Sequence, residues 1–206
     1  MSWDEYASGW DDQPGVRDYA QAAFDSLVVT AEARGVQIAG ARACDFGCGT
    51  GLLTEHLVGL CGHIDAVDSS PAMIEMLRDK IERHHWSNVG VFEELPGSAV
   101  PYDLVVCASV CAFVDDYPGV VHQLASSMAP GGLFVQWDWE LDIADDEPFG
   151  LIRKVIRDAL EAAGLVSVHV DTAFELSVAD QTMRPLIGVG QRPHTGRAAG
   201  GQPPPT

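Results

Sequence analysis

Residues 44–57, CDFGCGTGLLTEHL, place three glycines within five positions, directly behind an acidic residue. Glycine lets the backbone approach a ligand closely and adopt left-handed conformations that other residues avoid. The segment before these glycines, 41–46, is typical of a short strand, and 51–60 has the apolar spacing of a helix. In an α/β protein such a loop lies at the tip of a strand and points the amides of the helix N-terminus at a ligand. The sequence therefore predicts a ligand site at this loop.

Strands and helices alternate along the rest of the chain. Further helices are predicted at 16–34, 71–84, 117–128 and 148–163, and further strands at 63–68, 88–92, 102–110, 133–140, 165–176 and 183–192. Alternation of this kind indicates a mostly parallel sheet with helices on both faces. We therefore predict an α/β, Rossmann-like fold with seven strands and an antiparallel last strand. A short polar stretch separates the last two strands, so we expect them to form a hairpin on one edge of the sheet.

The 206 residues carry 30 Asp and Glu against 12 Lys and Arg, which gives a formal net charge of −18. A field of this sign repels phosphate backbones and anionic lipids, so we expect neither nucleic acid nor a membrane as a partner. The acidic, aromatic N-terminus lacks the pattern of a signal peptide, and no apolar run approaches the ~20 residues of a membrane span. We expect a cytoplasmic protein, either a monomer or a homodimer.

Four of the five cysteines form two pairs spaced four residues apart, Cys44 with Cys48 and Cys107 with Cys111. We interpret them as reduced thiols of a cytoplasmic protein. A zinc site is the alternative, but this spacing differs from the C-x-x-C pattern of zinc knuckles. We therefore expect no metal.

The loop has three candidate ligands: a triphosphate, a dinucleotide, or a smaller cofactor with positive charge. No GxxxxGK[ST] motif and no nearby lysine support a triphosphate. A dinucleotide site needs GxGxxG, but Leu52 occupies the place of its third glycine. Asp45, two residues before the first glycine, would repel a pyrophosphate and attract an ammonium or sulfonium group, unless it serves only as a turn residue. Asp68 ends the next predicted strand, where an acid binds the hydroxyls of a ribose in either kind of nucleoside.

Four motifs in order resemble the signatures of class I S-adenosylmethionine (SAM)-dependent methyltransferases. They are DFGCGTG at 45–51, VDSSPAM at 67–73, YDLVVCASV at 102–110 and APGGLFV at 129–135. The resemblance covers residues 40–140, and WDEYASGWD at 3–11 resembles the helical lead-in of small members. It implies a transferase in which residues 1–35 form an N-terminal lid and 36–192 the SAM-binding core, with SAM as cofactor and S-adenosylhomocysteine (SAH) as product. The composition of 193–206 predicts a disordered tail. The segment between the fifth predicted strand and the last helix is short, which leaves little room for a substrate-recognition insert and favours a small-molecule acceptor.

The resemblance implies a role for each position of the cofactor site. The methionine part of SAM is expected along Asp45, Gly47, Cys48 and Gly49, the ribose at Asp68, the adenine between Ser69 and Met73 and under Glu94 and Leu95, and the methionine end at Ala108 and Ser109. The family often has an aspartate at the end of the third strand to bind the adenine amino group. Val91 occupies that place here, with Glu93 and Glu94 as the nearest acids.

The acceptor is expected beyond the fourth and fifth predicted strands. Strand alternation places Asp138 and Glu140 on one side, where either can act as a general base or bind an amine. It places Trp137 and Trp139 on the other side, where an indole can stack on the acceptor or hold a cation. The N-terminal Trp3, Tyr6 and Trp10 are a second aromatic group that is expected to fold over the site, and Arg17 is a candidate for binding the cofactor carboxylate.

The alternative reading of these aromatic and acidic residues is ordinary packing and solvated surface. Three other functions stay open at this point: methylation of a protein, SAM binding without catalysis, and an NAD-linked oxidoreductase, which Leu52 and Asp45 disfavour. The in-line displacement of a methyl group needs little from the protein besides alignment, so the sequence indicates the cofactor far better than the acceptor.

Overall fold

The computed structural model describes residues 3–97, 100–141, 149–178 and 181–194. Within these ranges the strands are β1 (Arg42–Phe46), β2 (His63–Val67), β3 (Val89–Phe92), β4 (Tyr102–Ala108), β5 (Met128–Asp138), β6 (Val166–Thr172), β7 (Leu176–Val178), β8 (Gln181–Met183) and β9 (Leu186–Gln191). The helices are α1 (Asp4–Ala7), α2 (Val16–Ala33), α3 (Leu52–Leu57), α4 (Pro71–His84), α5 (Tyr117–Ser126) and α6 (Arg153–Ala162), with short 3-10 helices η1 (Trp10–Asp12) and η2 (Cys111–Phe113).

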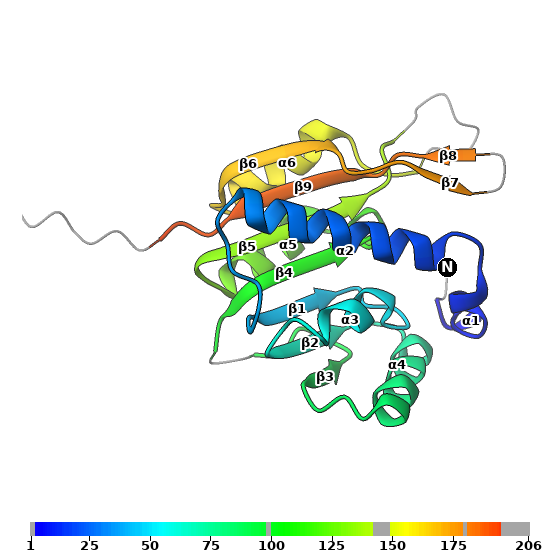
Figure 1. Ribbon diagram of the computed structural model, residues 1–206. Helices are drawn as coiled ribbons and strands as arrows, with labels where there is room; N and C mark the ends of the chain where they lie inside the picture. Colours follow the sequence, from blue (N-terminus) through cyan, green and yellow to red (C-terminus); the bar gives the residue numbers. More distant parts are fainter. Residues whose placement is uncertain (1–2, 98–99, 142–148, 179–180, 195–206) are drawn as a thin grey trace, which may run out of the picture.

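Seven of these strands form one sheet in the order β3-β2-β1-β4-β5-β9-β6 (Figure 1). Strands β1 to β5 pair in parallel, whereas β9 is antiparallel to both of its neighbours, β5 and β6. The predicted Rossmann-like α/β fold is therefore confirmed. The parallel strands bring the carboxyl ends of β1, β2, β4 and β5 to one edge of the sheet, which is where α/β proteins bind ligands.

The C-terminal part differs from the prediction in two places. The last two sheet strands, β6 and β9, are antiparallel neighbours as expected, but the polar stretch between them is part of a separate hairpin formed by β7 and β8. Helix α6 begins at Arg153 rather than at 148, because Leu151 pairs with the end of β5: its amide donates to the carbonyl of Trp139 at 2.8 Å. Residues 142–148 and 195–206, including most of the predicted tail, lie outside the described ranges.

The sheet is buried on both faces between two layers of helices. Helices α2 and α3 cover one face, where Leu27 and Leu57 pack on Leu104 and Trp137. Helices α5 and α6 cover the other face. These contacts explain why β4 and β5 are almost continuously apolar, since each strand faces helices on both sides.

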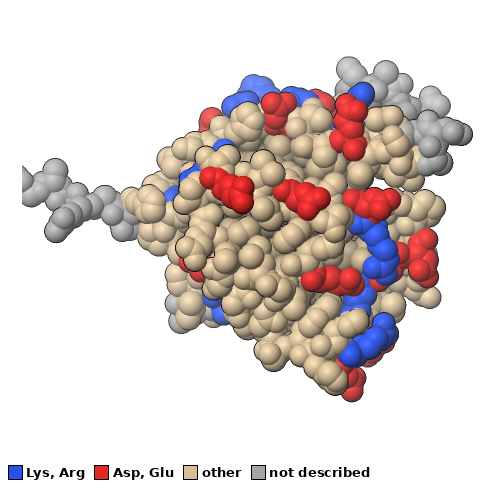
Figure 2. All heavy atoms as spheres, in the orientation of Figure 1, with Lys and Arg blue, Asp and Glu red and all other residues tan. Residues whose placement is uncertain are grey.

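Local sequence signals place the helix that follows β2. Ser70 caps helix α4 because its hydroxyl accepts a hydrogen bond from the amide of Met73 at 3.2 Å, and Pro71 is its first residue. Every helix within the described ranges is too short or too polar to span a bilayer. In Figure 2 the acidic side chains are spread over this face of the molecule among uncharged residues.

A buried carboxylate joins three strands at the end of the sheet away from the glycine loop. Asp65 on β2 is 1% exposed and accepts a hydrogen bond from the hydroxyl of Tyr102 on β4 at 2.7 Å. It also forms an ion pair with Arg42 on β1, and Nε2 of His63 lies within hydrogen-bond distance of it at 2.8 Å. The guanidinium of Arg42 lies over the ring of Tyr102, 5.3 Å from its centroid. The charge of Asp65 is therefore paired where β1, β2 and β4 meet.

Replacing Asp65 with alanine is expected to lower the free energy of unfolding by about 3–5 kcal/mol, because it leaves the guanidinium of Arg42 without its buried carboxylate. Tyr102→Phe removes one hydrogen bond and is expected to cost about 1–2 kcal/mol. Urea denaturation followed by circular dichroism measures both, with Asp25→Ala on the exposed face of α2 as the control. A loss for Asp65→Ala no larger than the control would contradict this assignment.

Candidate active site

A cavity of about 810 Å³ opens at the carboxyl ends of β1, β2, β4 and β5. Its size falls within the range of small-molecule sites, roughly 300–1,000 Å³. The glycine loop forms its floor, and Trp3, Trp10 and the first turn of α2 close it from the N-terminal side. The cavity therefore lies where the sequence predicted a ligand site.

The glycine loop turns back tightly over the neighbouring strands. The amides of Gly47 and Cys48 both donate to the carbonyl of Val67 at the end of β2, at 2.8 and 3.0 Å. Gly47 has φ +71°, and a Cβ at this position would lie 2.3 Å from a methyl group of Val110. Only glycine meets both conditions, so this residue decides how closely the loop packs on β2 and β4.

Asp68 connects the loop to the end of β2. Its carboxylate accepts hydrogen bonds from the amides of Gly49 and Ser70, at 2.8 and 2.9 Å. Burial raises the pKa of this carboxyl, and the two amides oppose that rise. A carboxylate has about four lone-pair positions, so Asp68 keeps acceptor capacity for hydroxyl groups in the cavity that it lines.

Asp45 is a buried acid in the wall of the cavity and is 1% exposed. One carboxylate oxygen accepts from the hydroxyl of Thr54 at 2.6 Å, while the other, Oδ1, has no hydrogen-bond partner within the described residues. Burial raises the pKa of Asp45 to about 6, against the hydrogen bond from Thr54, and the charge of Asp68 raises it further. An unpartnered buried carboxylate oxygen is costly, so it favours a cationic donor in the cavity.

The charges that line the cavity are of one sign. Four carboxylates contribute to its lining, those of Asp45, Asp68, Glu93 and Glu94, and no Lys, Arg or His of the described chain does so. Such a lining attracts a ligand with positive charge and repels a pyrophosphate.

Most of the predicted cofactor residues line this single cavity. They are Asp45, Gly47, Cys48, Gly49, Asp68, Ser69, Met73, Glu94, Leu95, Ala108 and Ser109. Glu93 lines it as well, whereas Val91 packs in an apolar cluster beside α4. The amides of Gly47, Cys48 and Gly49, along which the resemblance places the methionine part of SAM, donate to groups of the protein itself. Arg17 also lies outside the lining and pairs with Asp11 at 3.3 Å.

The structure separates the residues expected on the acceptor side. Trp139 and Trp10 line the cavity, and Tyr6 packs on Trp3 outside the lining, with ring centroids 5.9 Å apart. Trp137 is fully buried under α2, and its Nε1 donates to Ser26 at 3.3 Å. Strand alternation assigns a residue to a face of the sheet, but only the end of the strand borders the cavity, which is why Trp139 reaches it and Trp137 does not.

Neither of the two acids proposed as bases lines the cavity. Glu140 is exposed and forms a two-point ion pair with Arg153, at 2.8 and 3.1 Å. Asp138 is buried behind the wall, where it accepts from the amide of Ala112 at 3.1 Å and from the side-chain amide of Gln136 at 3.0 Å. Burial raises its pKa to about 7, and these hydrogen bonds oppose the rise.

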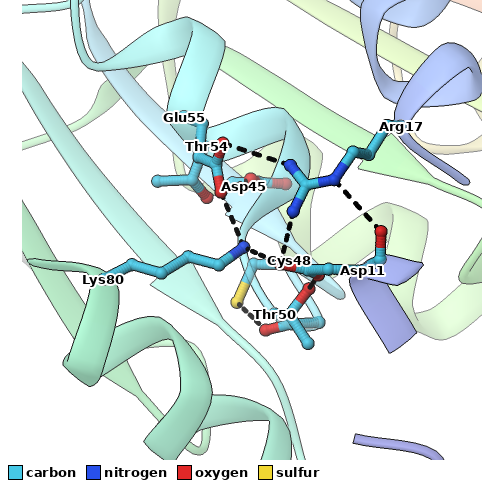
Figure 3. A network of polar contacts seen from close by, with 9 residues as sticks. Asp11, Arg17, Asp45, Cys48, Thr50, Thr54, Glu55 and Lys80 are labelled. Carbon is cyan, nitrogen blue, oxygen red and sulfur yellow. Dashed lines mark hydrogen bonds and ion pairs between the residues drawn. The ribbon is translucent and has the colours of Figure 1, made fainter. Parts of the chain in front are cut away.

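Sequence reasoning missed the polar contacts that hold the N-terminal segment over the cavity (Figure 3). Lys80 on α4 is 6% exposed, and its Nζ lies 2.6 Å from carboxylate oxygens of both Asp11 on η1 and Glu55 on α3. Asp11 also accepts from the hydroxyl of Thr50 in the glycine loop at 2.5 Å. Asp4 on α1 accepts from the hydroxyl of Ser70 at 2.6 Å. We call these contacts of Asp4 and Asp11 the latch. Nothing in the local sequence predicts it, because its members lie up to 69 positions apart.

Tyr19 was also not predicted from the sequence as a site residue, because its position fits the apolar face of a helix. Its ring lines the cavity, and its hydroxyl accepts a hydrogen bond from the hydroxyl of Ser109 at 2.8 Å. Ser109 has φ +54°, a conformation that is uncommon for residues other than glycine. Burial raises the pKa of Tyr19 far above its ordinary value, so the phenol stays protonated.

We expect Lys80→Met to open the latch, because the substitution keeps the apolar stem but removes the buried cation between Asp11 and Glu55, which then share only the exposed Arg17. Hydrogen exchange read by mass spectrometry should show at least about tenfold faster exchange in residues 4–12, since local opening free energies respond directly to lost contacts. Arg78→Met, on the exposed side of the same helix, is the matched control. Unchanged exchange in residues 4–12 of Lys80→Met would show that the ion pairs do not hold the segment.

Asp138 should make the stability of the protein depend on pH. Its pKa is about 7 in the folded chain and about 3.9 when unfolded, so the folded state binds the extra proton between these values. Stability from this group is therefore lost as the pH rises from about 4 to 7, on the order of 2–4 kcal/mol. Asp138→Asn should flatten this part of the profile, measured by urea denaturation from pH 5 to 8. Parallel profiles for the two proteins would contradict the assignment.

Comparison with known proteins gives three findings. The sequence profile of the family described as "Methyltransferase domain" matches residues 44–134. Over 140 residues the chain is 30% identical to the ubiquinone biosynthesis O-methyltransferase of Xylella fastidiosa, and over 97 residues it is 36% identical to that of Methylocella silvestris. These alignments cover 63% and 46% of this chain and 54% and 38% of the relatives, so the chain spans about half or less of their length.

Solved structures share the fold at lower sequence identity. The N-methyltransferase NodS from Bradyrhizobium japonicum, in complex with SAH, superposes with a TM-score of 0.66 and 19% identity over 89% of this chain and 90% of that one. The magnesium protoporphyrin IX methyltransferase from Synechocystis, with bound SAH, gives a TM-score of 0.67 and 21% identity over 86% and 85% of the two chains.

Proposed function

We propose that this chain is a class I SAM-dependent methyltransferase that transfers a methyl group from SAM to a small-molecule acceptor, releasing SAH. The match of residues 44–134 to the methyltransferase domain family supports this proposal. In this proposal residues 1–35 act as a lid and residues 36–192 as the cofactor-binding core. The single observation that carries it is the charge of the cavity: four carboxylates and, within the described chain, no cationic side chain line a space at the glycine loop. SAM carries positive charge on its sulfonium and ammonium groups, so this lining suits it.

The residues that line the cavity fit the ammonium group, the ribose and the adenine of SAM. The free oxygen of Asp45 offers a buried acceptor to the ammonium group. Asp68, already oriented by two amides, offers its remaining lone pairs to the ribose hydroxyls. Ser69, Met73 and Leu95 provide a mostly apolar slot for the adenine, with Glu93 or Glu94 placed to accept from its amino group.

SAM supplies an already activated methyl group when it is bound, so the protein has to position the acceptor and exclude water. The lid performs the second task, because Trp3 and Trp10 close the cavity and the latch holds them there. Ala108 and Ser109 end β4 beside the glycine loop and border the space in which the acceptor meets the methyl group. The O-methyltransferase relatives support a small molecule as the acceptor.

Calorimetric titration with SAM, SAH and NAD tests the proposal. We expect micromolar affinity for SAM and SAH and no saturable binding of NAD. Asp68→Asn should lower the affinity for SAM at least about tenfold, a loss of at least ~1.4 kcal/mol in binding free energy. The substitution removes a charged acceptor for two ribose hydroxyls. Asp158→Asn on the exposed face of α6 is the matched control, and thermal melts verify that each variant is folded. Saturable NAD binding, or a folded protein that binds neither SAM nor SAH, would overturn the proposal.

A further inference from the structure

We propose that the methyl acceptor is an uncharged, planar aromatic molecule, stacked on Trp139 and oriented by the hydroxyl of Tyr19. This inference rests on the proposed function and adds the chemical class of its second substrate. It comes from the part of the cavity lined by the first turn of α2, the residue that follows β5 and the β7–β8 hairpin, which we call the acceptor chamber. Its described lining residues are Val16, Tyr19, Trp139, Leu176, Val178 and Met183.

Three segments that are distant in the sequence build the acceptor chamber. The first turn of α2 contributes Tyr19, the end of β5 contributes Trp139, and the β7–β8 hairpin contributes Val178. Figure 1 shows the hairpin extending beyond the sheet toward the beginning of α2. The approach is close: a Cβ on Gly15, which has φ +84°, would lie 2.5 Å from a methyl group of Val178. The chamber is therefore a packed structure rather than an open surface.

Charge is unevenly distributed along the cavity. The four lining carboxylates, those of Asp45, Asp68, Glu93 and Glu94, follow β1, β2 and β3, at the cofactor end. Within the described residues, the six side chains that line the acceptor chamber are all uncharged. Neighbouring strands lie about 4.8 Å apart, so Asp68 after β2 is roughly 14 Å, and Asp45 on β1 roughly 10 Å, along the sheet from the end of β5. Among these described side chains, a carboxylate, phosphate or ammonium group of the acceptor would lose its hydration without gaining a partner of opposite charge.

The aromatic side chains determine the shape that fits. The rings of Tyr19 and Trp139 lie 5.4 Å apart at 42°, and Phe174 meets Tyr19 edge-on at 5.5 Å. This packing fixes the ring of Tyr19 and leaves Trp139 at the cavity wall. Flat π-surfaces bind flat aromatic ligands by offset stacking better than they bind saturated rings of the same size.

The hydrogen-bonded hydroxyl groups of Tyr19 and Ser109 are the polar groups of the chamber that the acceptor can contact. Ser109 donates to the phenol oxygen at 2.8 Å, so the proton of Tyr19 is left to donate to a heteroatom of the acceptor. Tyr19 is therefore a positioning residue and not a base. In the transfer, a lone pair of the acceptor forms a bond to the methyl carbon while the carbon–sulfur bond breaks, and its electrons stay on sulfur. The proton that the acceptor loses passes to bulk water when the lid opens and the methylated product leaves.

A binding experiment on the full chain separates this inference from the proposed function. The protein is first saturated with SAH, which tests the cofactor site by itself. Three probes of matched size are then titrated by calorimetry: 2-naphthol, its carboxylated analogue 6-hydroxy-2-naphthoate, and the saturated decahydro-2-naphthol. We expect 2-naphthol to bind at least about tenfold more tightly than either analogue. The naphthoate has to bury an unpaired carboxylate, and decahydro-2-naphthol has no aromatic face to stack on Trp139.

Substitutions test the two named residues. Trp139→Leu should lower the affinity for 2-naphthol about tenfold, and Trp139→Phe should keep most of that affinity. Neither substitution should change the affinity for SAH more than about twofold. Tyr19→Phe should raise the apparent KM for a turned-over aromatic acceptor about 3–10-fold with a smaller change in kcat, as for a hydrogen bond used in positioning. Two results would overturn the acceptor class in a protein that binds SAH. One is equal affinity for all three probes, and the other is an unchanged affinity for 2-naphthol in Trp139→Leu. A folded protein that does not bind SAH would overturn the proposed function instead.

Discussion

The close packing of the glycine loop on the ends of β2 and β4 is the constraint on which the site depends. Gly47 and Cys48 both donate to Val67, and the space beside Gly47 is filled by Val110. The loop can turn this sharply only with glycine at that point. Because it does, the chain brings Asp45 from β1 and Asp68 from β2 into one cavity, which is the geometric origin of its charge.

Acidic and basic side chains occupy different positions around the cavity. Carboxylates line the proposed cofactor end of the cavity, whereas Lys80 and Arg17 lie outside the lining in ion pairs with Asp11 and Glu55. A buried lysine is costly alone and is stabilised here by two carboxylates. The same pairs hold the N-terminal segment across the glycine loop, so the arrangement that keeps cations out of the cavity also closes it (Figure 3).

The proposed cofactor end and the proposed acceptor end of the cavity come from different parts of the chain. The residues assigned to the cofactor lie within 44–134, the part of the chain that matches the methyltransferase domain family. Those lining the acceptor chamber, from Val16 and Tyr19 through Trp139 to Met183, all lie outside this range. The family match therefore supports the cofactor strongly and leaves the acceptor to be inferred from the side chains that surround it.

The sequence by itself determined the fold class, the glycine loop and the set of acids at the strand ends, because strand periodicity, turn glycines and helix caps are local signals. Of the aromatic residues that it proposed on the acceptor side, Trp139 and Trp10 line the cavity. Only the tertiary structure decided that Trp137 is core, that Asp138 is buried behind the wall, and that Glu140 pairs with Arg153. The sequence could not predict the latch or the Tyr19–Ser109 pair. Their hydrogen bonds and ion pairs join residues 39 to 90 positions apart, so they depend on how helices pack across the sheet and leave no periodic signal.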